Sequence, residues 1–299
     1  MPFAQPYRGR FAPSPTGLLH AGSLTTAVGS YLQARTQGGE WLLRMEDLDP
    51  PREMPGASAA ILRTLEALGF AWDGPVVYQS QRLDAYQQAL DHLVAQQRAY
   101  PCACTRREIA LAGQAGLDGV VYPGTCRAGL PAGRTGRAWR LRVPAGLTRV
   151  VDGLHGPIEQ DVLACVGDYV LKRADGLFAY QLAVVVDDAW QGVNAVVRGA
   201  DLLDSTTRQI VLQQALGVAT PSYVHLPVLV NAAGEKLSKQ TLAPAIRPDA
   251  AAAELRLALT RLGHPPPADC GGLAELWAWA LAHWQVSRVS AAPVVVREG

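Results

Sequence analysis

The chain has 299 residues, of which 49% are hydrophobic and 18% are charged, and its formal net charge is +1. This composition is typical of a globular enzyme with a substantial core, and it excludes a disordered chain and a coiled coil. No run approaches the roughly 20 apolar residues of a membrane span, the start lacks the features of a signal peptide, and five cysteines indicate a reducing compartment, so we expect a cytoplasmic protein.

The first hundred residues predict a β-loop-α-β unit. A strand is expected over residues 7–11, a helix with apolar positions at helical spacing from Leu24 to about Arg35, and a second strand over 41–45. This order is typical of a parallel sheet, and open α/β sheets bind their ligands at the carboxyl ends of the strands. Glu46 falls at that edge.

After the first hundred residues the sequence turns to cysteines, glycines, prolines and short β-like segments. We interpret residues 101–190 as an inserted domain, which divides the nucleotide-binding fold into a first half, 1–100, and a second half, 191–242. The second half is expected to contain a helix over 205–216 and a strand over 224–230.

The end of the chain has a different pattern. Apolar residues recur at helical spacing over 250–262 and 273–284, and no repeat or low-complexity tract is present beyond a local alanine run. Residues 243–299 therefore predict a small helical region that follows an α/β fold.

Two short segments more than two hundred residues apart make sense as halves of one nucleotide site. The first runs from Pro13 to Ser23 and opens a helix, whose free N–H groups and dipole favour a phosphate, while His20 can donate to a phosphoryl oxygen. The second, Glu235-Lys236-Leu237-Ser238-Lys239-Gln240, is a loop with two lysines. Each segment alone is more often structural, as a helix start or as a solvated loop.

Together, in this order and separation, the two segments resemble the HIGH and KMSKS signatures of class I aminoacyl-tRNA synthetases, and residues 10–17 resemble the glutamyl subgroup. The resemblance runs from about residue 7 to residue 240. It departs at Ser23, which replaces the last histidine of HIGH, and at Leu237 and Gln240. It implies a Rossmann-like parallel sheet with an inserted zinc-bearing domain.

The resemblance implies activation of an amino acid by ATP. Attack of the carboxylate on the α-phosphate builds negative charge that positioned cations and donors must stabilise, and Mg²⁺ normally bridges the phosphates. The catalytic residues are then expected to be His20, Lys236 and Lys239. The full set expected to bind ATP is Pro13, Gly17, His20, Gly22, Ser23, Lys236 and Lys239.

Recognition of L-glutamate needs cationic or donor groups for two carboxylates and one acid for the ammonium. By resemblance, Glu46 takes the ammonium, and the complete pocket is expected to be Arg10, Phe11, Ala12, Pro13, Ser14, Glu46, Tyr180 and Arg198. Three alternatives stay open from the residues alone: a helix cap for Glu46, a core aromatic for Tyr180, and a surface ion pair for Arg198. The sequence does not divide the two carboxylates between the arginines.

Three thiols and a phenol fall within one loop of the predicted insert. Thiolates suit zinc, although the C-x-C spacing is weaker evidence than C-x-x-C, and a metal-free loop is the alternative. By resemblance to glutamyl-type enzymes that bind zinc here through three cysteines and a tyrosine, one structural Zn²⁺ is expected on Cys102, Cys104, Tyr122 and Cys126. Tyr122 is the least secure ligand, because a phenol must lose its proton to bind well.

Only about sixty residues follow Gln240, whereas an ordinary glutamyl-tRNA synthetase carries a large anticodon-binding domain there. This architecture resembles the paralogues that join glutamate to the queuosine base in the anticodon loop of tRNA(Asp), and that activate glutamate without tRNA. Two alternatives are a minimal glutamyl-tRNA synthetase that charges the tRNA 3′ end and a non-catalytic RNA-binding paralogue. We expect no membrane association and no obligate protein partner.

Overall fold

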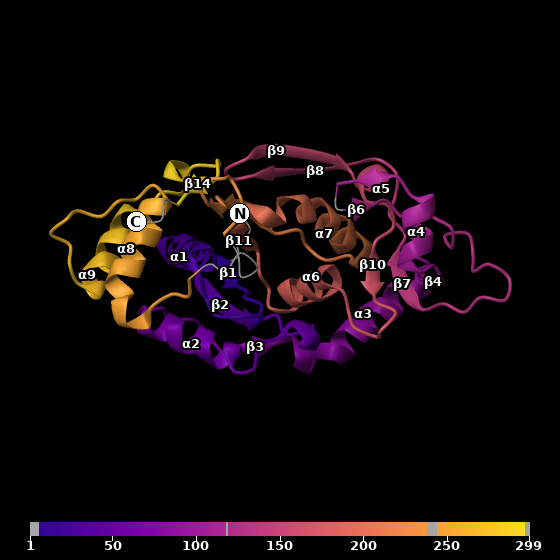
Figure 1. Ribbon diagram of the computed structural model, residues 1–299, viewed down its shortest axis with the longest axis horizontal. Coiled ribbons are helices and arrows are strands. Elements are labelled where there is room, and N and C mark those ends of the chain that lie inside the picture. The colour runs from indigo at the N-terminus through magenta and orange to yellow at the C-terminus, as the bar shows by residue number, and fades with distance from the viewer. Residues whose placement is uncertain (1–5, 118, 238–243, 297–299) are drawn as a thin grey trace.

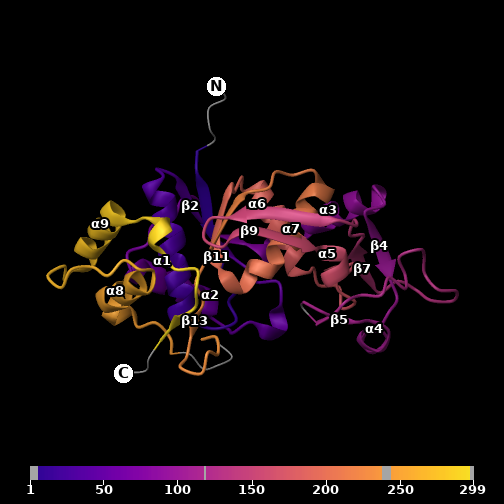
Figure 2. The same ribbon diagram turned by 90° about the horizontal axis from the view of Figure 1, so that it is seen from above.

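The computed structural model describes residues 6–117, 119–237 and 244–296. The molecule is elongated, and both views place the helices of the C-terminal region at one end and a small cysteine-bearing sheet at the other (Figures 1 and 2). Two groups of parallel strands lie between these ends. Among the described residues no helix combines the length and the apolar character that a membrane span requires.

The first group of strands confirms the predicted β-loop-α-β unit. Parallel strands β1 (Arg8–Phe11), β2 (Glu40–Met45) and β3 (Val77–Tyr78) lie in the order β1-β2-β3, with Phe11 opposite Leu43. Helices α1 (Ala21–Thr36), α2 (Ala57–Ala67) and α3 (Leu83–Ala95) connect or follow them. Trp41, Leu43 and Met45 of β2 are fully buried, so the apolar run that predicted this strand forms the centre of the core.

The second group adds parallel strands β11 (Ala195–Gly199) and β12 (Ser222–Leu226), which are joined through α7 (Leu203–Leu216). Helix α7 ends at Gly217, whose φ of +69° is the left-handed conformation that favours glycine at a helix C-terminus. The N–H of Asn194 donates to the carbonyl oxygen of Arg8 over 3.1 Å, so β11 lies beside β1. The carboxyl ends of β1, β2 and β11 therefore meet at one edge.

Two elements differ from the sequence-based expectation. The strand predicted over 224–230 is divided into β12 and β13 (Leu229–Val230), because Pro227 cannot donate a ladder hydrogen bond, and β13 pairs with β14 (Val294–Val295). Helix α6 (Tyr180–Trp190) was not predicted at all. The sequence analysis assigned this segment to the inserted domain, whereas the helix is buried on more than one face in the second core cluster with α3 and α7.

The cysteine-bearing end contains an antiparallel sheet of β4 (Ala99–Cys102), β7 (Ala138–Leu141) and β10 (Val170–Lys172), in the order β10-β7-β4. Around it lie the short elements α4 (Arg106–Ala112), β5 (Ala115–Gly116), β6 (Gly119–Val120) and α5 (Val162–Cys165). A long hairpin, β8 (Leu147–Asp152) and β9 (Gly156–Asp161), returns from this end and pairs Asp152 with Tyr223 of β12. The sequence analysis did not predict the β8–β9 hairpin or its pairing with β12.

Helices α8 (Ala251–Arg261) and α9 (Leu273–His283) pack against α1 and close the first core cluster. The Trp277 ring lies 5.0 Å, centroid to centroid, from both Tyr31 and Phe70, and its Nε1–H donates to the carbonyl oxygen of Leu68 over 2.8 Å. The remaining helical turns are five short 3₁₀ segments among the described residues: Pro50–Arg52, Gln79–Arg82, Ala200–Leu202, Pro248–Ala250 and Val286–Arg288.

The contacts of Trp277 predict a large effect on stability. Trp277→Ala removes a buried aromatic ring and a hydrogen bond, and we expect urea unfolding to show a loss of about 3–5 kcal/mol. Leu257→Ala, at a position on α8 that is 48% exposed, is the matched control and is expected to change the free energy of unfolding by about 0.5 kcal/mol. Equal effects of the two substitutions would contradict the packing described for α9.

Candidate active site

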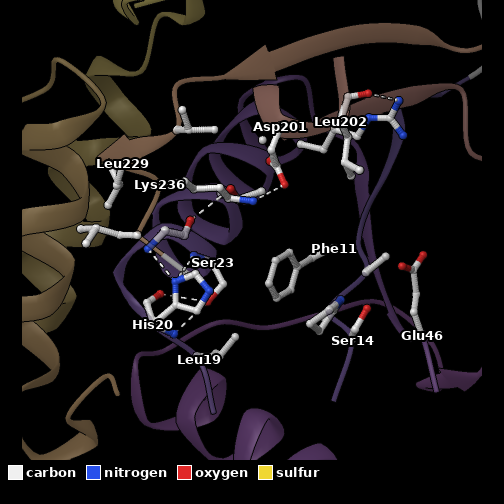
Figure 3. Close-up of a pocket in the computed structure, with 18 of the residues that line it drawn as sticks. Phe11, Ser14, Leu19, His20, Ser23, Glu46, Asp201, Leu202, Leu229 and Lys236 are labelled. Atoms are coloured by element: carbon white, nitrogen blue, oxygen red, sulfur yellow. Dashed lines mark hydrogen bonds and ion pairs between the residues drawn. The ribbon is translucent and has the colours of Figure 1, made fainter. Parts of the chain in front are cut away.

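A cavity of about 670 Å³ opens where the carboxyl ends of β1 and β11 meet the start of α1. Figure 3 shows His20, Ser23 and Lys236 along one side of it, Ser14 and Glu46 on the other, and Phe11 between them. The predicted site residues that line it are Arg10, Phe11, Ala12, Pro13, Ser14, His20, Gly22, Ser23, Glu46, Tyr180, Arg198 and Lys236. Gly17 belongs to the same loop but not to the lining, and Lys239 lies outside the described residues.

His20 is the residue that caps α1. Its Nδ1 accepts hydrogen bonds from the N–H groups of Gly22 (3.2 Å) and Ser23 (3.4 Å), and Ser23 Oγ lies 2.9 Å from both the backbone N and the carbonyl oxygen of His20. The departure from HIGH at Ser23 thus completes a reciprocal cap. Because Nδ1 accepts, the ring proton resides on Nε2, and the imidazole can act as a donor towards an anion in the cavity.

The two distant motifs pack against each other. His20 forms an antiparallel bridge with Ala245, and a Cβ added at Gly22 would lie 3.6 Å from the carbonyl oxygen of Leu237. Lys236 Nζ forms an ion pair with Asp201 Oδ2 at 2.6 Å, at the edge of the same cavity. The segment that carries Lys236 therefore lies over the start of α1, and helix N-termini are positions where phosphates bind.

A buried charge network forms the floor of the site. Arg44, on β2, is fully buried, and its Nη2 lies 2.8 Å from Asp188 Oδ1 and 3.6 Å from Glu46 Oε1. Arg10 Nε donates to the same Asp188 oxygen over 3.2 Å. Burial would raise the pKa of Asp188, but the two guanidinium groups hold it below its usual value, so Asp188 stays ionised and neutralises both arginines in part.

Glu46 is the acidic group that faces the cavity. Its side chain is 9% exposed, and Oε1 has no hydrogen-bond partner among the described residues. Burial raises the pKa of Glu46 to about 7, although Arg44 and Arg10 oppose the shift. A ligand ammonium would supply the missing partner and favour the ionised form. Because Asp49, and not Glu46, precedes the next helical turn, the helix-cap alternative is wrong.

Arg198, on β11, is 4% exposed, so the alternative of a surface ion pair is wrong. Its guanidinium donates to His225 Nε2 (3.0 Å), Gln209 Oε1 (2.8 Å), Thr206 Oγ1 (2.8 Å) and the carbonyl oxygen of Leu202 (3.3 Å). All four acceptors are neutral, and Arg198 forms no ion pair within the part of the chain that the structure describes. A carboxylate in the cavity would therefore meet a cation that is held in place but not neutralised.

Tyr180 begins α6 and separates two cavities. It lines the main cavity and also a second one of about 240 Å³, and burial raises the pKa of its phenol. The two cavities also share Ser14, Thr16 and Glu46, so they adjoin each other at these side chains. Tyr180 also packs at the margin of the second core cluster. It is therefore both a core aromatic residue and part of the cavity lining.

Several residues of the site were missed by the sequence analysis, above all Arg44, Asp188 and Asp201. One signal was available: an arginine inside the apolar run of β2 and the pair Asp187-Asp188 inside an apolar segment are charges that must find partners when buried. Asp187 indeed accepts from Gln79, Arg82 and Tyr86 over 2.6–2.9 Å.

The three clustered thiols lie together at the far end of the molecule. The Sγ atoms of Cys102, Cys104 and Cys126 are all within 4.8 Å of one another, and Cys104 Sγ is 3.6 Å from Cys126 Sγ. Tyr122 Oη lies 3.4 Å from Cys102 Sγ and 3.6 Å from Cys104 Sγ. In a tetrahedral site with Zn–S bonds of about 2.3 Å the sulfurs are roughly 3.8 Å apart, so this donor set fits a metal ion.

Comparisons with known proteins agree with this fold. Residues 7–262 match the family model described as tRNA synthetases class I (E and Q), catalytic domain. The solved structures that resemble the chain include a glutamate tRNA ligase from Elizabethkingia meningosepticum in complex with its amino acid, with a TM-score of 0.79 and 25% identity over 97% of this chain and 67% of that one. The chain therefore belongs to the class I tRNA synthetases of the E and Q type.

Two curated relatives narrow the comparison. The chain is 67% identical to the glutamyl-Q tRNA(Asp) synthetase of Chromobacterium violaceum, over 96% of this chain and 97% of that protein. It is 64% identical to the glutamyl-Q tRNA(Asp) synthetase of Dechloromonas aromatica, over 95% and 96% of the two chains. The match thus extends over nearly the full length of both relatives.

Proposed function

We propose that this enzyme activates L-glutamate with ATP as glutamyl-adenylate, without tRNA, and transfers the glutamyl group to the queuosine base at the wobble position of the tRNA(Asp) anticodon. The observation that carries the proposal is the main cavity, whose lining combines a buried arginine without an ion pair among the described residues, an acid, a helix N-terminus and a lysine. The near full-length identity to proteins named for the queuosine reaction supports the choice of acceptor. A tRNA substrate places the enzyme in the cytoplasm.

The glutamate subsite follows from charge. Glu46 receives the α-ammonium, and Arg10 and Arg198 face the two carboxylates, with Ser14 and Tyr180 beside them. Ion pairs between the substrate and these side chains are strong because the side chains are already buried and oriented. Binding of the substrate therefore requires little further desolvation of the protein.

In the first step a glutamate carboxylate oxygen forms a bond to the α-phosphorus of ATP, and the bond to the pyrophosphate oxygen breaks. His20 donates its Nε2–H to a phosphoryl oxygen, and Lys236 and Lys239 neutralise the charge that develops on the leaving pyrophosphate. Mg²⁺ bound to the phosphates supplies further charge stabilisation. Lys236 exchanges its ion pair with Asp201 for one with the nucleotide.

The second cavity supports the transfer step. It adjoins the glutamate subsite through Glu46 and Tyr180, and Phe178, Arg52 and Arg173 also line it. We place the acceptor nucleoside there, where an aromatic ring can stack on a splayed base and the arginines can meet phosphates of the anticodon loop. A hydroxyl of the modified base then attacks the glutamyl carbonyl carbon, and AMP leaves.

The cysteine cluster is proposed to hold one structural Zn²⁺ through Cys102, Cys104 and Cys126, with Tyr122 as the fourth ligand. A closed site of this kind contributes folding energy and no catalysis. Burial raises the pKa of the Tyr122 phenol, so its ligation depends on the charge of the metal to remove the proton.

A second candidate function is charging of the 3′ end of tRNA(Glu), which the likeness to a glutamate tRNA ligase favours. The non-catalytic alternative is disfavoured because His20, Glu46 and Lys239 are all retained in the sequence. Aminoacylation assays separate the two remaining candidates.

The acceptor is tested by supplying the enzyme with ATP and labelled glutamate together with tRNA(Asp) that contains queuosine, tRNA(Asp) that lacks it, or tRNA(Glu). We expect label only on the queuosine-containing tRNA(Asp), and we expect that label to persist when the 3′-terminal adenosine is removed enzymatically before the assay. Label on tRNA(Glu) that is lost after oxidation of its terminal adenosine would instead establish the second candidate.

The pKa of Glu46 predicts a pH dependence. A protonated Glu46 cannot pair with the substrate ammonium, so kcat/KM for glutamate in ATP–pyrophosphate exchange should fall as the pH drops below about 7, by roughly tenfold per pH unit. Glu46→Gln should lower kcat/KM by roughly 10- to 100-fold at pH 8 and abolish this acid limb. If the limb persists unchanged in the variant, another group is responsible.

The zinc proposal is tested by elemental analysis of protein purified without chelator. We expect about one zinc per chain, and we expect Cys104→Ser to lose most of it and to unfold at a lower temperature. Cys165→Ser, outside the cluster, is the control and should keep its zinc. Zinc-free wild-type protein with an unchanged melting temperature after chelation would show that the loop is metal-free.

A further inference from the structure

Arg198 is the cavity-facing end of a buried chain of hydrogen-bonded side chains. The chain begins outside the main cavity, at Asp152, and passes through His225. His225, on β12, accepts the Nε–H of Arg198 at Nε2 (3.0 Å), and its Nδ1 lies 2.7 Å from Asp152 Oδ2. The side chains of His225 and Asp152 are both 0% exposed. Asp152 is the last residue of β8, on the hairpin that returns from the cysteine-bearing end and joins β12.

The geometry fixes the hydrogens in this chain. Asp152 also accepts from the backbone N–H groups of Leu154 (2.9 Å) and His155 (3.0 Å), which keep its carboxylate ionised and oriented. An ionised Asp152 selects the His225 tautomer that carries its proton on Nδ1, and the Nε2 lone pair is left to accept from Arg198. Burial lowers the pKa of His225, which agrees with a neutral ring.

Only this tautomer is compatible with the position of Arg198. A proton on His225 Nε2 would face the Nε–H of Arg198, and the two donors would repel each other. With the observed bonds, Arg198 uses Nε, one hydrogen of Nη1 and both of Nη2, which leaves the second Nη1 hydrogen without a partner among the described residues. Arg198 lines the main cavity, so this hydrogen is the one available to a ligand carboxylate.

Asp152 also supplies charge balance. Arg10 and Arg44 share the carboxylate of Asp188, whereas the described residues offer Arg198 only neutral partners. The nearest compensating charge along its hydrogen bonds is Asp152, one imidazole ring away. At this distance the Asp152 carboxylate stabilises the buried guanidinium of Arg198 but does not pair with it directly, so Arg198 still attracts a carboxylate ligand.

We propose that Asp152 and His225 are positioning residues that aim Arg198 at a carboxylate of the acidic amino acid, and that they thereby set the affinity for glutamate without touching it. The inference rests on the proposed function, because it assigns a role within the same glutamate subsite. It also makes the β8–β9 hairpin part of substrate recognition.

The first test compares Asp152→Asn with Glu159→Gln, a matched control on the same hairpin that removes an exposed ion pair with Arg149. We expect Asp152→Asn to raise the KM for glutamate in ATP–pyrophosphate exchange by roughly 10- to 100-fold, by analogy with the outer partners of metal ligands, and to leave the KM for ATP unchanged. The control should match the wild type in both constants. An unchanged glutamate KM, or an equal rise of both constants, would overturn the proposal.

Two further measurements separate positioning from a general structural effect. His225→Gln keeps an oxygen that can accept from Arg198, whereas His225→Leu does not, so the glutamine variant should retain more affinity for glutamate. In a double-mutant cycle, Asp152→Asn should have little additional effect once Arg198→Lys is present, because its influence passes through the guanidinium. Additive effects would place the action of Asp152 elsewhere.

The outcomes also distinguish this inference from the proposed function. If the wild type shows no glutamate-dependent exchange, the proposed function fails and the inference fails with it. If the wild type exchanges normally and Asp152→Asn does the same, only the positioning role is lost. Histidine ¹⁵N spectra supply a readout that is independent of activity: His225 should be protonated at Nδ1 in the wild type, and protonation at Nε2 would contradict the proposal.

Discussion

The site depends on how this fold accommodates three buried arginines near the carboxyl ends of its central strands. Arg44 and Arg10 share the carboxylate of Asp188 on α6, which neutralises them in part, whereas Arg198 is held by neutral acceptors. Removing one member of a buried ion pair typically costs about 3–5 kcal/mol, because it leaves an uncompensated charge. Asp188 therefore ties helix α6 to β1 and β2, whereas Arg198, on β11 of the second group, has only neutral hydrogen-bond partners among the described residues.

The same arrangement links parts of the chain that are far apart in sequence. Glu46 follows β2, Tyr180 begins α6, Arg198 lies on β11, and Asp152 belongs to a hairpin that returns from the cysteine-bearing end. The start of α1 and the segment around Lys236 meet on the opposite side of the cavity. In the proposed function, substrate selection and phosphate binding thus use separate elements that share one cavity.

The sequence predicted the parts of the fold that have strong local signals. Sequence analysis found the apolar run of β2, the glycine that ends α7 and the two C-terminal helices. Hydrophobic periodicity and helix-ending residues mark these elements in the sequence. Helix α6 was missed because its segment was assigned to the inserted domain, and the pairing of β8 with β12 was missed because strand pairing over some seventy residues leaves no local pattern. In the site, resemblance supplied the residues that face the cavity, whereas their supports, such as Asp188 and Asp152, are defined only by contacts.

The central claim is that one cavity holds an acidic amino acid against Arg198 and Glu46 while its activated carboxyl group reaches the start of α1. A crystal structure with a non-hydrolysable glutamyl-adenylate analogue tests it most directly. The account predicts the ammonium beside Glu46, a carboxylate within hydrogen-bond distance of Arg198, and the phosphate mimic beside His20. An analogue bound elsewhere, or one whose carboxylate contacts neither Arg198 nor Arg10, would contradict it.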